Sequence, residues 1–413
     1  MMSLIQGTKW FVLLGCLGLT ACGSAPANVF QPVGEAAVPA SASKVSMLVA
    51  TSRQPSQDPG TLFTGERSPI LSLTTIDISI PPDSARESGT VQWPTKVPPN
   101  PEKEFAVIAV KRQTTDEARR WIRQGAARSG RVLVFVHGFN NRFADAVLRF
   151  AQIVHDSNAD AVPILFTWPS RGSVFDYVYD KESANFSRVA LERSLQVLAS
   201  DRSVSDITVL AHSMGTWLTV EALRQMGIRN GRIPAKIKNV ILASPDLDVN
   251  VFARQWAEMG DSHPRFTIFV SQDDKALAMS KLISGGVKRV GAINPAEEPY
   301  RSALEQAGIT VIDLSNLRTG DRLSHAKFAE SPEIVHLIGE RLVAGQALTS
   351  TDVNLGEGIS AVLLGTANTV GSIAATTVSA PVNVLQPRPQ PARPAAVGEI
   401  LQNQAEAKVP PGG

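Results

Sequence analysis

One serine follows an apolar segment in a way that suits nucleophilic chemistry. Residues 207–211 are typical of a parallel strand buried on both faces, and Ser213 lies just beyond them, between the small residues Ala211 and Gly215. Apolar residues then recur at helical spacing as far as Gly227, which we expect to end the helix. A serine on such a tight strand-to-helix turn stands clear of the backbone, at a helix N-terminus that favours developing negative charge. This pattern predicts a nucleophile.

A serine nucleophile needs a general base, and the chain has six histidines. His325 follows the last expected strand, 310–313, so it should lie at the carboxyl ends of the strands, where α/β sheets keep their active sites. We expect His212, beside Ser213, to point elsewhere and His137 to act as a structural brace. Position along the chain argues against the remaining three, which are His155, His263 and His336. We therefore predict His325 as the base.

An acid should orient that base, and the expected chain order of serine, acid and histidine places it between the two. Asp274 is the preferred candidate because it follows the expected strand 266–270, and Asp273 is the reserve. Asp246 and Asp248, after the preceding strand, are the fallback. Each of these aspartates could instead cap a helix, a common role at such positions.

Two backbone N–H groups should face the oxyanion that forms during attack. One comes from Met214, the residue after the nucleophile, and the other from the loop after the expected strand 132–136. In that loop Phe139 is the candidate donor, and Gly138 permits close approach of the backbone.

Aromatic residues follow the expected strand 164–167 and are candidates for a pocket wall. They are Trp168, Phe175, Tyr177 and Tyr179. Arg171 could meet an anionic head group. The alternative is that the aromatic rings pack in the core and that Arg171 is a solvated charge. Histidines and carboxylates do not fall at metal-ligand spacing, so we expect no metal and no cofactor.

Strands and helices alternate through most of the chain, which predicts an α/β fold with a mostly parallel, doubly wound sheet and antiparallel N-terminal strands. The expected strands are 45–50, 71–80, 105–110, 132–136, 164–167, 207–211, 240–243, 266–270 and 310–313. The expected helices are 115–124, one capped by Asn141, 183–199, one after Ser213, and 331–343 with Ser331 as cap and Pro332 at its first position.

Four segments together resemble a known family. They are Val-Phe-Val-His-Gly-Phe-Asn-Asn at 134–141, Phe-Thr-Trp-Pro-Ser at 166–170, Ala-His-Ser-Met-Gly at 211–215 and Asp-Asp-Lys-Ala-Leu at 273–277. Over about residues 45–345 the chain resembles the bacterial α/β-hydrolases that are esterase- or lipase-like and have no settled substrate. The resemblance implies the α/β-hydrolase fold, a triad of Ser213, Asp274 and His325, and Phe139 and Met214 as oxyanion donors. It supplies no substrate.

The first 21 residues have the order of a signal peptide, with Lys9 before an apolar stretch at 10–19. Leu-Thr-Ala-Cys at 19–22 resembles the lipobox of bacterial lipoproteins, which implies cleavage before Cys22 and lipid attachment to it. The alternative is an ordinary secretory signal with a coincidental cysteine. The resemblance places the protein in the bacterial cell envelope, lipid-anchored, with the outer membrane facing the periplasm favoured because Gly23 rather than aspartate follows. Such a chain would keep no second cysteine for a disulfide.

Composition shifts mark the remaining boundaries. We expect a flexible tether at 22–43, the hydrolase domain at 44–345, and a low-complexity tail at 346–413 that is rich in Gly, Ala, Ser and Thr and then in Pro. Residues 358–387 are uncharged but too weakly apolar to favour a membrane span. The net charge of +2, without a one-signed run, gives no reason to expect nucleic acid as a partner.

These features predict a membrane-anchored serine hydrolase that cleaves a small-molecule or lipid ester through an acyl-enzyme. An acyltransferase or thioesterase with the same triad is one alternative. A non-catalytic envelope-binding lipoprotein is another, although a scaffold would not need Ser213 and His325 together.

Overall fold

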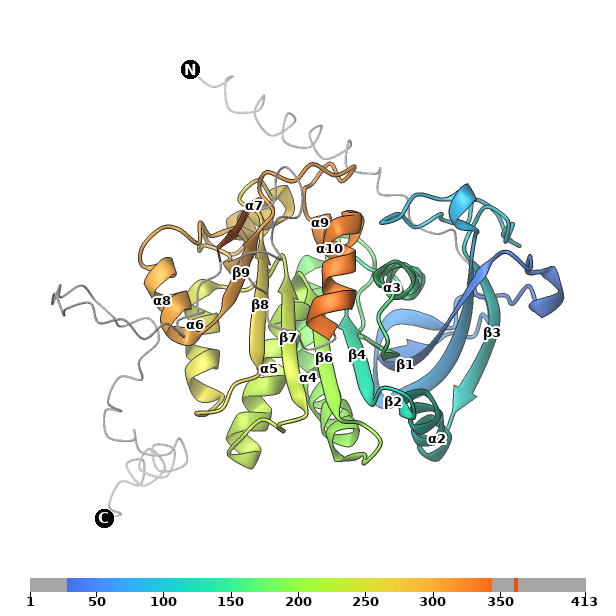
Figure 1. Ribbon diagram of the computed structural model, residues 1–413, viewed down its shortest axis with the longest axis horizontal. Helices are drawn as coiled ribbons and strands as arrows, with labels where there is room; N and C mark the ends of the chain where they lie inside the picture. The colour runs from blue at the N-terminus through green and yellow to red at the C-terminus, as the bar shows by residue number, and fades with distance from the viewer. Residues whose placement is uncertain (1–27, 344–359, 363–413) are drawn as a thin grey trace, which may run out of the picture.

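The strands of the molecule form one twisted sheet in the order β10-β9-β8-β7-β6-β4-β5-β1-β2-β3. The computed structural model describes residues 28–343 and 360–362 (Figure 1). The strands are β1 (Ser43–Pro55), β2 (Phe63–Ile80), β3 (Ala106–Gln113), β4 (Arg131–Val136), β5 (Val162–Thr167), β6 (Asp206–His212), β7 (Ile237–Ala243), β8 (Arg265–Val270), β9 (Thr310–Asp313) and β10 (Ser360–Val362).

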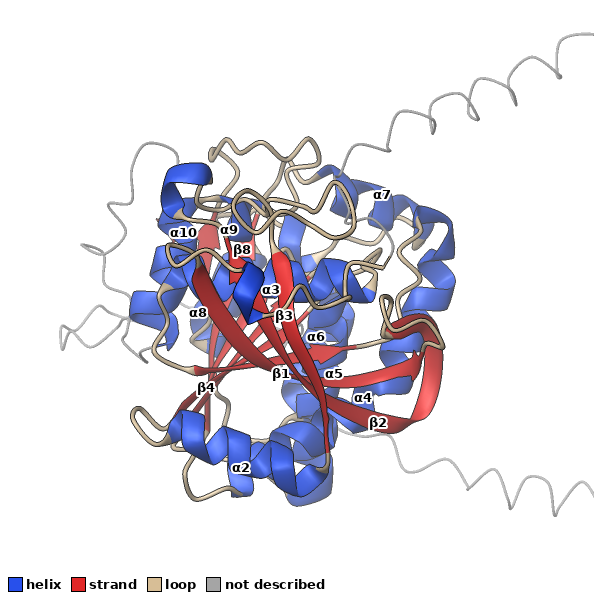
Figure 2. Cartoon of the chain, turned by 90° about the vertical axis from the view of Figure 1, so that its right-hand side faces the viewer, coloured by secondary structure: helices blue, strands red, loops and turns tan. Residues whose placement is uncertain are grey.

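Strand directions confirm the predicted fold class. From β1 to β9 the neighbours pair in parallel, while β2 and β3 extend the sheet antiparallel beyond β1. Figure 2 shows the strong twist of the sheet and the long, curved β1 and β2. The register aligns Thr51 of β1 with Thr167 at the end of β5. The last residues of β1 therefore extend past the carboxyl ends of the parallel strands.

Helices cover both faces of the sheet. They are α2 (Thr115–Ala126), α3 (Phe143–Ser157), α4 (Tyr177–Ser200), α5 (Met214–Asn230), α6 (Val249–Glu258), α7 (Lys275–Ile283), α8 (Tyr300–Ala307), α9 (Lys327–Glu330) and α10 (Pro332–Leu337). The short η4 (Val174–Asp176) leads into α4, and Ile338–Val343 form a π-helix. The apolar side chains of α2, α4, α5, α6 and α8 join one core, and those of α3, α9 and α10 join the other.

Alternating residues of the central strands supply these two cores. In β4, Val134 and Val136 enter the core beside α5, while Leu133 and Phe135 enter the core beside α3. A strand that buries both faces reads as a continuous apolar run. This is why the expected strands and the observed ones agree closely from β4 to β9.

Several helix boundaries differ from expectation. Helix α4 begins at Tyr177 rather than at 183, and the last helix changes to a π-helix at Ile338. Helix α5 continues through Gly227 to Asn230 and ends at Gly231, whose φ is 69°. Gly227 is needed for close packing instead, because a Cβ there would lie 2.3 Å from the carbonyl oxygen of Met259. Helix α3 begins after Arg142, which is its N-cap residue and whose backbone N–H donates to the Asp145 carboxylate. Asn141 therefore does not cap this helix. The Ser331 cap and Pro332 at the first position of α10 are as predicted.

The folded region begins earlier than expected. Val29 and Phe30 are buried, and the Phe30 ring lies 5.0 Å from that of Phe143 in α3. This part of the predicted tether therefore belongs to the domain. The signal segment and Cys22 lie outside the described residues.

At the other end, a short piece of the predicted tail pairs with the sheet. Residues Ser360–Val362 form β10, antiparallel to β9, while the rest of 346–413 lies outside the described residues. Among the helices that are described, none has the length and hydropathy to cross a bilayer.

Candidate active site

Ser213 occupies a strained turn between β6 and α5. Its φ of 52° and ψ of −123° are unusual for a residue with a side chain, and such strain is concentrated at functional sites. The backbone N–H of Ser213 donates to Ala243 of β7 at 2.9 Å and holds the turn against the sheet. A Cβ on Gly215 would lie 2.3 Å from the carbonyl oxygen of His137, so the predicted small residue is a steric requirement.

The structure joins Asp274 to His325. Asp274 follows β8, and its Oδ2 accepts a hydrogen bond from His325 Nδ1 at 2.7 Å. Its Oδ1 accepts from the N–H of Leu277 and caps α7, so one buried carboxylate serves both the cap and the imidazole. A donor Nδ1 leaves Nε2 of a neutral His325 free to act as a base.

The other aspartates are engaged elsewhere. Asp273 binds the buried ammonium of Lys327 at 2.8 Å. Asp248 caps α6. Asp246 accepts from Tyr177 and Ser280 and pairs with Arg289 at 3.3 Å. Of the four candidate acids, Asp274 is the one that contacts His325.

The loop that carries His325 is held through the backbone N–H and the backbone carbonyl of His325 itself. The N–H donates to Asp321 Oδ2 at 2.5 Å, while the carbonyl accepts from His212 Nε2 at 3.2 Å and from Ser244 Oγ at 3.1 Å. His212 is therefore bonded to the His325 backbone, consistent with its exclusion as the base, although its ring centroid lies 4.7 Å from that of His325. Burial and the neighbouring His325 lower the pKa of His212 well below its usual value, which keeps it neutral.

Burial and carboxylates act on His325 in opposite directions. Burial of the imidazole favours its neutral form, but the negative charges of Asp274, Asp246 and Asp321 outweigh that effect and raise the pKa of His325 above its ordinary 6.5. Within the described chain Ser213 and His325 are not hydrogen-bonded to each other. Catalytic hydrogen bonds are often loose before substrate binds and tighten in the complex.

Two backbone donors lie at the elbow and at the loop after β4. Among the described residues, neither the Phe139 N–H nor the Met214 N–H donates to a protein group. Gly138 packs directly on Ser213, because a Cβ at this position would lie 2.8 Å from the Ser213 Cβ. The loop thus approaches Ser213 as an oxyanion donor must.

A buried arginine binds the backbone of this loop, and it was not among the residues predicted from the sequence. Arg53, near the end of β1, is fully buried. Its guanidinium donates to Thr167 Oγ1 at 2.9 Å and to the carbonyl oxygens of Asn141 at 2.7 Å and Ser170 at 2.8 Å. Burial lowers the pKa of Arg53 to about 10, so the side chain remains a cation at neutral pH. The available signal was an arginine three positions after the end of the apolar run at 45–50.

His137 completes the brace beneath the loop. Its Nδ1 lies 2.8 Å from the Gly138 carbonyl, and its Nε2 lies 2.9 Å from Thr167 Oγ1 and accepts from the Trp168 N–H. Burial, followed by the charge of Arg53, lowers the pKa of His137 to about 3. A histidine that stays neutral and fully bonded is a structural brace, as expected.

Asp180 anchors the same loop from α4. Its carboxylate accepts from Ser170 Oγ at 2.5 Å and from the N–H groups of Asn140 and Arg171. Ser170 Oγ in turn accepts from the Asn141 N–H. The His-Gly-Phe-Asn-Asn and Thr-Trp-Pro-Ser segments therefore meet around one polar network.

The residues predicted to line a pocket lie in different places in the structure. Trp168 is fully buried, stacks on His137 and donates from Nε1 to its carbonyl, so it belongs to the brace rather than to a pocket wall. Arg171 pairs with Glu66 and Asp176 and lies over the Tyr179 ring, so neither Arg171 nor Tyr179 is placed as expected. Tyr177 packs edge-on against Phe139, at 5.3 Å between ring centroids, and lies beside the oxyanion loop.

The other histidines play no part in this cluster. His155 contacts Asp156 and Arg86, His263 stacks on Trp256, and His336 is exposed on α10 as expected. In the described ranges, no group of three metal-ligating side chains is placed to hold a metal ion.

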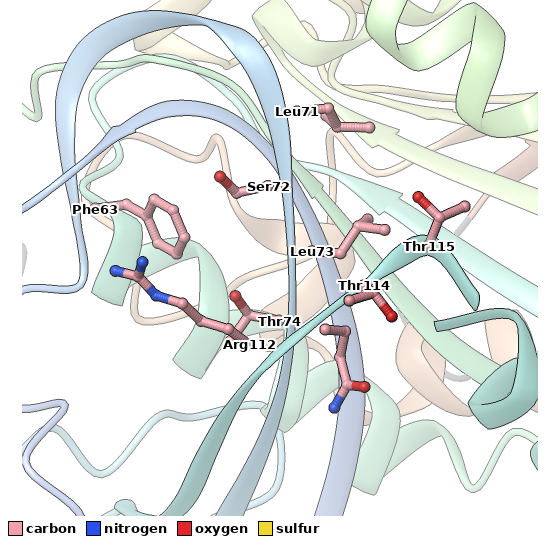
Figure 3. Close-up of a pocket in the computed structure, with 9 residues that line it drawn as sticks. Phe63, Leu71, Ser72, Leu73, Thr74, Arg112, Thr114 and Thr115 are labelled. Carbon is pink, nitrogen blue, oxygen red and sulfur yellow. The ribbon is translucent and has the colours of Figure 1, made fainter. Parts of the chain in front are cut away.

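A separate pocket of about 430 Å³ lies on β2 and β3 and is shown in Figure 3. Its lining includes Phe63, Thr74, Arg112 and Thr115, and it contains none of the predicted site residues. This pocket is therefore separate from the predicted site residues at the carboxyl edge of the sheet.

Comparison with known proteins agrees with this architecture. Residues 114–341, more than half of the 413-residue chain, match the family described as alpha/beta hydrolase of unknown function (DUF900). An uncharacterized protein from Nostoc sp. is 32% identical over 120 residues, which are 23% of this chain and 31% of that protein. The chain thus spans less than a third of that relative's length.

A solved structure from Lactobacillus plantarum, provisionally named a cell surface hydrolase, is 12% identical. The match covers 54% of this chain and 94% of that one, with a TM-score of 0.35. The match to the family model over the elbow, the acid and the histidine loop shows that the chain belongs to this α/β-hydrolase family.

Proposed function

We propose that this hydrolase is a serine hydrolase that cleaves ester bonds through an acyl-enzyme on Ser213. The observation that carries the proposal is the 2.7 Å hydrogen bond between His325 Nδ1 and Asp274 Oδ2, at the sheet edge where the strained elbow presents Ser213. A half-buried histidine bonded to a buried aspartate supplies a base with a fixed tautomer. The strained φ of Ser213 is hard to explain in a scaffold that only binds.

The proposed steps follow from these positions. Ser213 Oγ attacks the ester carbonyl carbon while His325 Nε2 takes the hydroxyl proton, and the carbonyl oxygen becomes negative between the Phe139 and Met214 N–H groups. The C–O bond to the alcohol then breaks, and His325 returns the proton to the departing oxygen. Water, activated by the same base, releases the acid and restores Ser213.

A fluorophosphonate probe tests this proposal, since only an activated serine attacks phosphorus quickly. Peptide mapping should find the probe on Ser213, and His325→Ala should abolish labelling, while His336→Ala leaves it unchanged. A folded protein labelled at another serine, or not at all, would contradict the proposal. Product analysis with and without an acceptor alcohol then separates hydrolysis from acyl transfer.

We also propose that Cys22 carries a lipid anchor in the bacterial cell envelope, with the outer membrane favoured. The support is the lipobox-like segment at 19–22. Cys22→Ala should move the protein from the membrane to the soluble fraction or block its processing. Unchanged membrane fractionation of that variant would show that lipid on Cys22 is not the anchor.

A further inference from the structure

Large apolar side chains lie exposed on two neighbouring segments beside the active site. The apolar rim, as we name it, consists of Val174, Phe175 and Val178 at the start of α4 and Met279, Leu282 and Ile283 on α7. Phe175 is 88% exposed and Leu282 is 73% exposed. Contiguous exposed apolar side chains of this size mark interaction surfaces.

The contacts of Tyr177 show that the two segments of the rim adjoin. Tyr177 lies between Phe175 and Val178, and its hydroxyl is 3.0 Å from Ser280 Oγ on α7. Its ring also packs on Phe139 of the oxyanion loop. Asp274, the proposed triad acid, in turn caps the N-terminus of α7. The rim therefore borders the site on two sides.

The exposed charges on the α7 side of the rim are positive, whereas on the α4 side Asp176 is paired with Arg171. The stretch 275–296 contains no Asp or Glu, and Lys275, Lys281 and Lys288 are all exposed. Exposed apolar side chains on a short helix with lysines alongside are typical of segments that lie in a membrane interface with anionic lipid.

The N-terminal end of the domain lies at the same edge of the sheet. Asn28 packs against Gly60, in the loop that follows β1, and Phe30 N–H donates to the Gly60 carbonyl at 2.9 Å. Because β1 is parallel to β5, this loop lies at the carboxyl edge with the site. Cys22 lies six positions before Asn28, and even fully extended this span reaches only about 20 Å. A lipid on Cys22 would thus keep this edge close to the bilayer.

We propose that the apolar rim docks on an anionic lipid surface and holds the active-site edge of the sheet against it. Val174, Phe175, Leu282 and Ile283 would enter the interface, and the three lysines would meet the headgroups. This docking goes beyond the proposed ester hydrolysis and does not depend on it.

An environment-sensitive dye at single positions tests the docking. In the full-length chain with Cys16→Ala and Cys22→Ala, bimane is attached at Phe175→Cys, at Leu282→Cys, or at Ile228→Cys as control. Ile228 is also apolar and 57% exposed, but it lies near the far end of α5, about 22 Å of helix from Ser213. All three proteins share the same N-terminus, so differences between the dyes come from their positions.

Vesicles of phosphatidylethanolamine and phosphatidylglycerol should shift the emission to the blue at positions 175 and 282 but not at 228. High salt, or Lys275, Lys281 and Lys288 all changed to Gln, should reduce the shift. No shift at 175 or 282, or an equal shift at 228, would overturn the proposal. A blue shift in the absence of vesicles would also overturn the proposal. If that shift grows with protein concentration, the rim contacts a second copy of the chain. If deletion of residues 346–413 removes the shift, the rim contacts that segment.

A second measurement rests on the proposed function. Phe175→Ser, Leu282→Ser and Ile283→Ser together should lower the ratio of activity on a vesicle-borne ester to that on a short soluble ester by about tenfold. Dye shifts without any esterase activity would leave the docking standing and contradict the function. Esterase activity with an unchanged ratio and no dye shift would leave the proposed function standing and contradict the docking.

Discussion

The proposed acid–base half of the site follows β8 and β9, and the proposed oxyanion half follows β4 and β6, so both lie at the same edge of the sheet but are held by different interactions. Asp274 and His325 sit among carboxylates, and the His325 loop is fixed by Asp321, His212 and Ser244. The oxyanion loop instead rests on the buried cation of Arg53, whose donors are spread over backbone carbonyls and a threonine hydroxyl.

The two halves should therefore respond differently to mutation: one sets the protonation of the proposed base, and the other sets the position of the oxyanion loop. Carboxylates around His325 set the pH at which the base works, so changes there should alter both the rate and its pH dependence. Arg53 and Gly138 fix where the loop lies, so changes there should alter the rate or the stability and leave the pH dependence in place. The predictions below test this division.

The largest effect should come from Asp274→Asn. Losing the triad acid leaves His325 in the wrong tautomer, and we expect kcat/KM to fall by about four decades in an ester hydrolysis assay. Asp273→Asn is the matched control, because that carboxylate binds Lys327 and not His325. Equal losses in the two variants would contradict the assignment.

Arg53→Met should mainly cost stability. It leaves the buried carbonyl oxygens of Asn141 and Ser170 without their donor, which we expect to lower the free energy of unfolding by about 3 kcal/mol. Urea unfolding measures this loss. Arg53→Lys keeps the charge but not the planar fork, so it should recover only part of the loss. Native stability in Arg53→Met would show that the loop does not depend on this residue.

Gly138→Ala should slow the reaction without changing its pH dependence. The new methyl would meet the Ser213 Cβ at 2.8 Å and displace the loop or the nucleophile, and a shift of about 1 Å can cost a hundredfold in turnover. Gly320→Ala is the control, since a Cβ there meets nothing within 4 Å. Turnover in the Gly138 variant equal to that of the control would contradict the proposed approach of the loop.

The smallest effect is on the pH profile. The pKa of His325 is raised, so kcat/KM should fall as the pH drops through a value above 6.5, where the base becomes protonated. The sign for stability is opposite: the contribution of protonated His325 is present below the unfolded pKa and is lost as the pH rises through the folded pKa. In Asp274→Asn the acid limb of residual activity should move to lower pH. An unmoved limb would mean that Asp274 does not set this pKa.

The proposed triad could be predicted from the sequence because each member lies in the connection that follows a parallel strand. Ser213 directly follows β6, Asp274 lies in the turn after β8, and His325 lies in the longer loop after β9, so strand order brings them to one edge. The oxyanion half depends on a contact between Arg53 and Thr167, which are distant in the chain and meet only because β1 pairs with β5. No local pattern encodes that pairing.

The aromatic residues show the same limit. Trp168 and Tyr177 both follow β5, yet one is a buried brace for His137 and the other lies beside Phe139. Residue type predicts that an aromatic ring will be largely covered, but not which surface covers it. The prediction that Gly227 ends α5 is wrong for a similar reason. A glycine is required there because the carbonyl oxygen of Met259, which follows α6, leaves no room for a Cβ.

The pairing of β10 with β9 bears on how the sheet meets other chains. An edge strand presents a row of unpaired N–H and C=O groups that can recruit a strand from another molecule. Ser360–Val362 occupy that row along Val311–Asp313, on a strand of only four residues. The segment after the last helix thus covers β9 and leaves at this end of the sheet a strand of only three residues, which offers a partner strand from another molecule few groups to pair with.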